Sequence, residues 1–70
     1  MEPVYPNLVR ELHAQGVSVS DLTKVLYLSR SAIYQRLSGK MDWKLAEVVA
    51  ICQYLEFSDA LELFLRFNTN

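Results

Sequence analysis

Hydrophobic residues recur at helical spacing in the segment that follows Ser18. Leu22, Val25 and Leu26 fall on one side of a helix with 3.6 residues per turn, while the polar residues between them point elsewhere. The Ser18 hydroxyl can accept the backbone N–H three residues on, and Asp21 can accept in return, which is a carboxylate variant of the capping box. The pattern therefore predicts an amphipathic helix that begins directly after Ser18.

A second short helix follows almost at once. Ser29 is its predicted N-cap, and Ile33 and Leu37 form its inner face. Its outer face is expected to present five polar side chains: Arg30, Ser31, Tyr34, Gln35 and Arg36. Only residues 27–29 remain to turn the chain between the two helices, and so short a connection is typical of a helix-turn-helix, here over about residues 18–39.

The remaining apolar positions predict helices on either side of this pair. The first covers residues 7–15 and ends at Gly16, which can adopt the left-handed conformation of a C-cap. Another is expected to begin at Asp42 and to turn one apolar stripe toward the core: Leu45, Val48, Val49, Cys52 and Leu55. Trp43 in its first turn is interpreted as a lid on that core. Residues 1–70 are therefore expected to form a single all-α domain of four or five helices.

A last helix is predicted after Ser58, and it is apolar on two sides. Leu61, Phe64 and Leu65 face one way, and Leu63 and Phe67 face another. One side can pack on the bundle, whereas an exposed apolar second side is typical of an interface. Leu63 and Phe67 are therefore expected to line a homodimer interface. The alternative is that both sides fill an irregular core.

Composition agrees with a small folded domain inside the cell. The 70 residues are 51% hydrophobic with two Gly and two Pro, and no run approaches the roughly 20 apolar residues of a membrane span. The N-terminus is acidic and interrupted by proline, unlike a signal peptide, and the single cysteine, Cys52, excludes an internal disulfide. We therefore expect a cytoplasmic protein that does not enter a membrane.

The net charge of −1 is unevenly distributed. Residues 22–46 carry a net +4, whereas residues 1–21 carry −2 and residues 47–70 carry −3. The basic third coincides with the predicted helix-turn-helix, where a protein that neutralises DNA phosphates needs cations. The chain has one His, no metal-spaced cluster, no glycine-rich phosphate loop and no nucleophile beside a base. We therefore expect no enzyme, metal site, cofactor or small-molecule substrate.

Several stretches resemble the lambda-repressor-like family, the Cro and repressor class of small DNA-binding domains of bacteria and temperate phages. The matching pieces are YPNL (5–8), Gly16 to Ser18, Leu22 with Leu26, LSRSAI (28–33), LSGK (37–40) and the pair Asp42 and Trp43. The resemblance spans about residues 5–64, and Val19, Thr23 and Tyr27 depart from the Gln, Ala and Gly that the family prefers at these positions. It implies a lambda-repressor-like bundle that binds double-stranded operator DNA as a homodimer.

The resemblance also implies roles for individual residues, with the helix after Ser29 in the major groove. The bases would be read by Arg30, Ser31, Tyr34 and Gln35. The phosphates would be held by Ser18, Ser20, Ser38, Lys40 and Lys44. A solvated helix face is the alternative for Tyr34 and Gln35.

A protein-interaction module on the same fold is the alternative function. Such a module would be an antirepressor or modulator that binds another regulator protein. The missing Gln at Val19, the acidic isoelectric point and the apolar final helix favour it.

Overall fold

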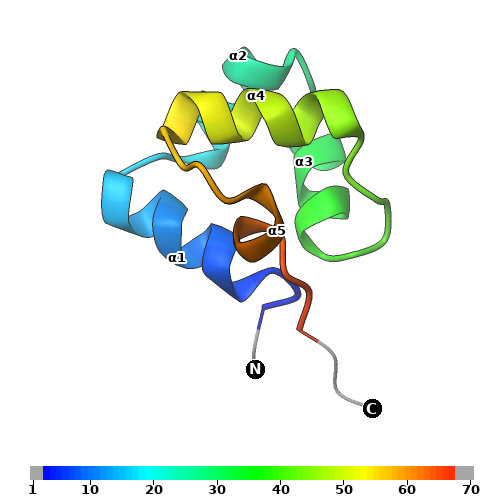
Figure 1. Cartoon of the computed structure of the whole chain (residues 1–70). Helices are drawn as coiled ribbons and strands as arrows, with labels where there is room; N and C mark the ends of the chain where they lie inside the picture. The colour runs from blue at the N-terminus through cyan, green and yellow to red at the C-terminus, as the bar shows by residue number, and fades with distance from the viewer. Residues whose placement is uncertain (1–2, 68–70) are drawn as a thin grey trace.

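Five helices account for most of residues 3–67, the part of the chain that the computed structural model describes, and that part contains no strand. In chain order they are α1 (Pro6–Gln15), α2 (Val19–Leu26), α3 (Arg30–Leu37), α4 (Leu45–Leu55) and α5 (Ala60–Leu63). Figure 1 shows α4 lying across the molecule, with α2 behind it, α3 toward one end, and α1 and α5 below. The predicted all-α class is confirmed. No helix within residues 3–67 is long and apolar enough to cross a membrane.

The core lies where α4 meets its neighbours. α4 packs against α1, α2 and α5, whereas α3, among the described helices, packs only against α2. The buried hydrophobic residues come from all five helices and from the segment before α1: Tyr5, Leu8, Leu12, Leu22, Ile33, Ile51, Leu55 and Leu63. Because α3 has a single helical neighbour, its orientation depends on whatever other contacts reach it.

Local signals in the sequence set the ends of the first helices. Gly16 ends α1 in the left-handed conformation with φ of 68°, as expected. Ser18 and Asp21 form the predicted capping box: the Asp21 amide donates to Ser18 Oγ at 3.1 Å, and the Ser18 amide donates to Asp21 Oδ2 at 2.9 Å. Ser29 caps α3 by accepting from the amide of Ala32 at 3.1 Å. These three boundaries are confirmed because each is specified within a few residues.

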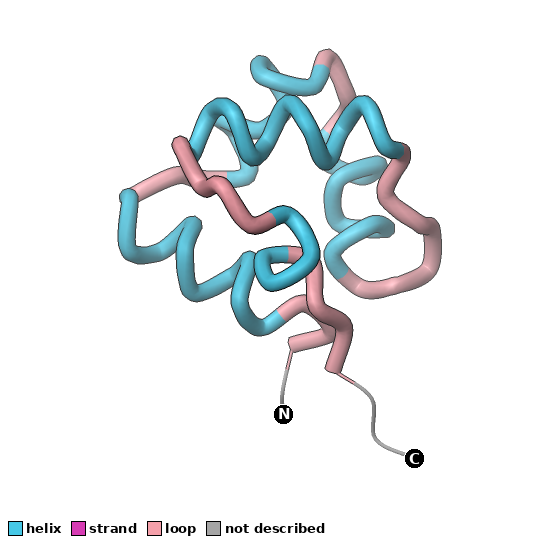
Figure 2. Tube along the Cα trace, in the orientation of Figure 1, coloured by secondary structure: helices cyan, strands magenta, loops and turns pink. Residues whose placement is uncertain are grey.

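The connection between α2 and α3 contains an unusual backbone conformation. Tyr27 ends α2 with φ of 56° and ψ of 42°, in the left-handed region that favours glycine. This conformation allows a short loop between α2 and α3 (Figure 2). The Tyr27 side chain is 93% exposed, so it gains little packing in return for the backbone strain.

The start of α4 differs from the sequence prediction. Asp42 does not cap the helix; α4 begins after Lys44, whose amide donates to Glu47 Oε1 at 3.0 Å. Trp43 lies in the irregular segment before the helix and packs edge-on against Tyr5 and Phe64, with ring centroids 6.4 and 5.6 Å apart. Trp43 is therefore half-buried against the core, as expected, although the helix starts later.

The predicted stripe of α4 is also wrong in part. Leu45 is 79% exposed and Val49 is 45% exposed, whereas Glu47 and Ile51 are buried. Leu55 is buried as expected, and Val48 and Cys52 are half-buried. Because α4 is apolar almost all round, its periodicity does not determine which side faces the core. The side is set by Glu47, which turns inward to a charged partner.

The C-terminal helix is shorter than predicted. α5 is capped by Asp59, not Ser58, and ends at Leu63. Leu63 is fully buried, so it cannot line a homodimer interface. Phe67 is exposed but lies beyond the helix, where its amide donates to the Val4 carbonyl at 2.6 Å. The chain leaves α5 to run beside the N-terminal segment, and the second helical face predicted for Leu63 and Phe67 therefore does not form.

Truncation of Ile33 tests the assignment of the core. Ile33→Ala leaves a cavity at a site with no solvent access and should lower the free energy of unfolding by about 2–4 kcal/mol. Leu61→Ala is the matched control, because Leu61 is highly exposed and its truncation should change stability by less than about 0.5 kcal/mol. Urea unfolding followed by circular dichroism measures both. Equal effects of the two changes would contradict the described core.

Substitution of Tyr27 tests the strained turn. Tyr27→Gly should leave the protein as stable as the wild type or more stable by up to about 1 kcal/mol, because relief of the left-handed strain offsets the flexibility that glycine adds to the unfolded chain. Tyr27→Ala keeps the strain, lacks the ring and serves as the control. A Gly variant less stable than the Ala variant would show that the turn has another conformation.

Candidate nucleic-acid interface

The outer face of α3 gathers the four side chains predicted to read bases. Arg30, Ser31, Tyr34 and Gln35 are all exposed. They lie on one side of the helix because residues four apart are neighbours on its surface. Ile33, on the opposite side, is fully buried and faces the core. The structure thus brings this set together on a solvent-facing surface, at the end of the molecule that α3 occupies in Figure 1.

The side chains predicted to hold phosphates fall into two groups. Ser18 Oγ donates its proton to Asp21 Oδ2 at 3.0 Å, and Ser38 Oγ donates to the Gln35 carbonyl at 3.1 Å, so both hydroxyl protons are already engaged. Ser20, in the first turn of α2, is half-buried. The lysines Lys40 and Lys44 are exposed and form no ion pair within residues 3–67. The two lysines are therefore the stronger candidates.

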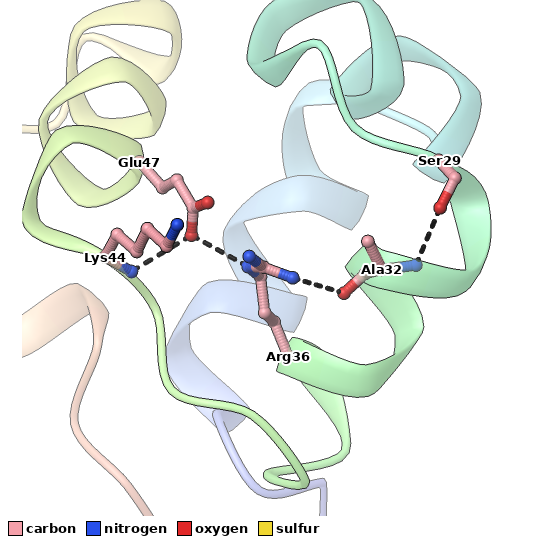
Figure 3. Close-up of polar contacts among 5 residues, drawn as sticks. All are labelled: Ser29, Ala32, Arg36, Lys44 and Glu47. Carbon is pink, nitrogen blue, oxygen red and sulfur yellow. Dashed lines mark hydrogen bonds and ion pairs between the residues drawn. The ribbon is translucent and has the colours of Figure 1, made fainter.

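Arg36 lies inside the molecule, contrary to its predicted place on the outer face of α3. It is only 4% exposed, and its Nε donates to Glu47 Oε1 at 2.8 Å. Glu47 is 8% exposed, and the same Oε1 atom also accepts the Lys44 amide at the start of α4. Figure 3 shows this carboxylate between the two donors. The ion pair joins the last turn of α3 to the first turn of α4.

The contacts of Arg36 continue along α3. Its Nη1 donates to the Ala32 carbonyl at 3.0 Å, and the Ala32 amide donates to Ser29 Oγ at the beginning of the helix (Figure 3). A planar guanidinium held by two acceptors has a fixed orientation. The pair therefore fixes α3 relative to α4, although these two helices do not pack directly against each other.

The sequence contains a signal for Glu47, one of the two partners of this ion pair. Glu47 stands three residues after Lys44, the spacing at which a glutamate side chain accepts the N-cap amide of a helix. Arg36 carries no such local signal, because its partner is 11 residues away and arginine is usually exposed.

The ion pair also changes the electrostatics of the basic third of the chain. The charge of Arg36 is neutralised by Glu47, so the exposed cations of residues 22–46 are Lys24, Arg30, Lys40 and Lys44. Asp42, in the same third, pairs with Arg66 at 3.6 Å on the surface. The positive potential near α3 is therefore smaller than the sequence count suggests and is confined to a few side chains.

Two carboxyl groups titrate below their usual range. Burial alone would raise the pKa of Glu47, but the hydrogen bonds from Arg36 and the Lys44 amide outweigh it and lower that pKa. Hydrogen bonds from the Ser18 amide and hydroxyl lower the pKa of Asp21. Both carboxylates are therefore more easily ionised in the folded protein than in the unfolded chain.

The remaining side chains that could take part in chemistry lie apart from one another. Cys52 is half-buried against the core, and burial, together with the charge of Asp59, raises the pKa of its thiol. His13 is exposed in the last turn of α1. Within residues 3–67 no pocket is found, and no three His, Cys, Asp or Glu side chains are grouped as metal ligands would be.

Comparison of the chain with protein-family models, with curated proteins and with solved structures finds no match. A proposed function therefore rests on the arrangement of the chain's own residues.

The lowered pKa of Glu47 predicts a pH-dependent stability. A carboxyl with a depressed folded pKa stabilises the fold above its unfolded pKa of about 4.5, and this contribution is lost as pH falls through the folded value. The wild-type free energy of unfolding should therefore decrease as pH falls from about 5 to about 3.

Glu47→Gln should be about 1–3 kcal/mol less stable than wild type at pH 7 and should lose less on acidification, with Asp21 supplying the remaining slope. Denaturant titrations at several pH values give both curves. Parallel curves for wild type and Glu47→Gln would contradict the lowered pKa of Glu47.

Proposed function

We propose that this protein is a cytoplasmic, non-enzymatic transcriptional regulator that binds operator DNA as a dimer through a helix-turn-helix formed by α2 and α3. In this proposal the fold is lambda-repressor-like, the protein is Cro-like or repressor-like, and α3 enters the major groove. The observation that carries the proposal is the outer face of α3. Four polar side chains suited to base edges are exposed there, while the opposite side is fixed by Ile33 and by the Arg36 ion pair.

The position of Arg30 supports a role in reading bases. It is the first residue of α3 and is exposed to solvent, directly after the Ser29 cap. A guanidinium can bond O6 and N7 of one guanine together. Gln35 can pair similarly with adenine, and Ser31 and Tyr34 lie between them on the same exposed side.

Lys40 and Lys44 support a role in docking to the backbone. Both follow α3 in the chain. Lys40 lies in the loop between α3 and α4, and Lys44 is the residue directly before α4. Ion pairing with phosphates fixes the register of a protein on DNA but carries no sequence information. With few exposed cations near α3, binding to random DNA should be weak and should fall steeply with salt.

A protein-interaction module remains the second candidate, as an antirepressor or modulator that binds another regulator. The observation that favours it is Tyr27, a 93% exposed aromatic ring held in a strained backbone conformation between α2 and α3. Backbone strain of this kind clusters at functional positions such as ligand-binding and switch regions. Exposed Tyr34 lies in the next helix and offers a second ring.

Paired substitutions at Arg30 and Lys40 test the DNA-binding proposal. Arg30→Ala should weaken binding to the cognate site by about 1–3 kcal/mol and change binding to random DNA little, since it removes a base contact. Lys40→Ala should weaken both alike and lower the slope of log K against log salt by about one. Fluorescence anisotropy measures the affinities of the wild type and both variants for a labelled cognate duplex, selected from a random pool, and for a labelled duplex of random sequence.

Two outcomes would overturn the proposal. If no duplex is enriched by the wild-type protein at low salt, sequence-specific binding is wrong. If Arg30→Ala keeps full cognate affinity while Tyr27→Ala abolishes binding of another regulator, the interaction module takes its place.

A further inference from the structure

One peptide group in the loop between α3 and α4 is held from both sides. Its N–H belongs to Lys40 and donates to the Gln35 carbonyl at 2.9 Å. Its C=O belongs to Gly39 and accepts from Arg66 Nη2 at 3.3 Å. The first contact ties the loop to α3, whereas the second comes from a residue that is 27 positions further along the chain. The backbone at Lys40 is therefore fixed by two separate parts of the molecule.

Arg66 reaches this loop from the segment that follows α5. This segment runs beside the N-terminal segment, where the Phe67 amide donates to the Val4 carbonyl at 2.6 Å (Figure 2). The Arg66 guanidinium also lies 5.6 Å from the centre of the Tyr5 ring, which is buried in the core. A cation over an aromatic face is attracted by the electron distribution of the ring. The core thus orients the guanidinium that contacts the loop.

The approach of Arg66 to the loop is close because position 39 has no side chain. A Cβ added to Gly39 would lie 2.6 Å from Arg66 Nη2 and 3.3 Å from Val4 Cγ1. Gly39 also has φ of 83°, in the region that glycine adopts most readily. The guanidinium therefore lies against bare backbone, where its planar set of donors can fix the orientation of the carbonyl.

Arg66 also brings a charge to the loop. It is the single Lys or Arg of residues 47–70, and Asp42 is the single Asp or Glu of residues 22–46. The two side chains pair at 3.6 Å on the surface. Exposed ion pairs of this kind contribute little to stability, so this one matters more for the local potential. Among the described charges of the loop, Lys40 and Lys44 are then left without an ion pair.

We propose that Arg66 is a positioning residue: it holds the Gly39–Lys40 peptide so that Lys40 is presented to a phosphate of the DNA backbone. The inference rests on the proposed function, because it takes Lys40 as a phosphate contact. Arg66 does not touch the phosphate and acts only through the loop. A binding group whose backbone is already ordered loses less conformational entropy when it binds. Arg66 thus raises the affinity for DNA of any sequence.

The same contacts keep the loop in register with the base-reading side of α3. The carbonyl of Gln35 accepts the Lys40 amide, and the side chain of Gln35 is exposed among those proposed to read bases. Phosphate contacts fix the position of a protein on the duplex, and base contacts depend on that position. Because Arg66 holds the other side of the same peptide group, it sets where docking occurs relative to reading.

Hydrogen exchange followed by NMR tests the positioning without DNA. Arg66→Met keeps an unbranched side chain but removes the donors, and the Lys40 amide should then exchange at least about fivefold faster than in the wild type. The Ile33 amide inside α3 should keep its rate. Arg10→Met is the matched control and should change neither rate, because Arg10 is exposed on α1, which does not pack against α3. Equal acceleration at Lys40 and Ile33, or none at Lys40, would overturn the proposal.

A charge-balanced variant separates positioning from electrostatics. Arg66→Met combined with Asp42→Asn removes one charge of each sign, so the net charge stays at −1. This variant should bind the cognate duplex and a random duplex about three- to tenfold more weakly than the wild type, with the ratio of the two affinities unchanged. Circular dichroism checks that it is folded. Wild-type affinity for both duplexes would mean that Arg66 acts by charge alone and would overturn the proposal.

Lys40→Ala shows whether Arg66 acts through Lys40. In a protein that already lacks the Lys40 side chain, the charge-balanced change should weaken DNA binding by less than about twofold, because interacting residues are not additive. An equal loss with and without Lys40 would show an independent contact between Arg66 and DNA, and the positioning role would be wrong.

Failure of this proposal and failure of the proposed function give different results. A wild type that enriches no duplex rejects the proposed function, and exchange of the Lys40 amide still decides whether Arg66 holds the loop. A wild type that binds its duplex specifically, but no more tightly than the charge-balanced variant, keeps the function and rejects the role of Arg66.

Discussion

The buried ion pair between Arg36 and Glu47 is the constraint on which the rest of the arrangement depends. α3 packs on α2 alone among the described helices, and Arg36 ties its last turn to the first turn of α4. Burial of two charges is costly, and apolar residues of similar size often give equal or greater stability. Unlike a contact between apolar side chains, an ion pair with fixed hydrogen-bond directions specifies how the two helices are oriented. The direction in which α3 presents its polar face to solvent follows from this geometry.

The same ion pair determines how α4 is used. Glu47 can reach Arg36 only if its side of the helix faces inward, and Ile51 and Leu55 then enter the core with it. Leu45 and Val49 are consequently turned to solvent, although they are as hydrophobic as the residues inside. An internal electrostatic requirement thus leaves an apolar surface outside.

The segments before α1 and after α5 stabilise the loop between α3 and α4. The rings of Tyr5, Trp43 and Phe64 meet edge to face. The Arg66 guanidinium lies 5.6 Å from the Tyr5 ring centre and donates to the Gly39 carbonyl at 3.3 Å. These contacts join the N-terminal segment, the loop before α4 and the segment after α5. They hold in place the loop that carries Lys40. The loop is therefore constrained at its base, while the lysine side chain itself stays in solvent.

Features that are specified over a few residues could be predicted from the sequence alone. The Ser18 and Asp21 box, the Ser29 cap, the Gly16 end of α1 and the inward side of α3 at Ile33 all form as predicted, because each depends on neighbours in the chain. The place of Arg36, the exposed side of α4 and the burial of Leu63 depend on tertiary contacts. Arg36 and Glu47 are distant in the chain, α4 has no polar side to fix its rotation, and α5 ends where the chain turns back to Val4. Local patterns cannot encode these outcomes, because each follows from contacts between segments that meet only after folding.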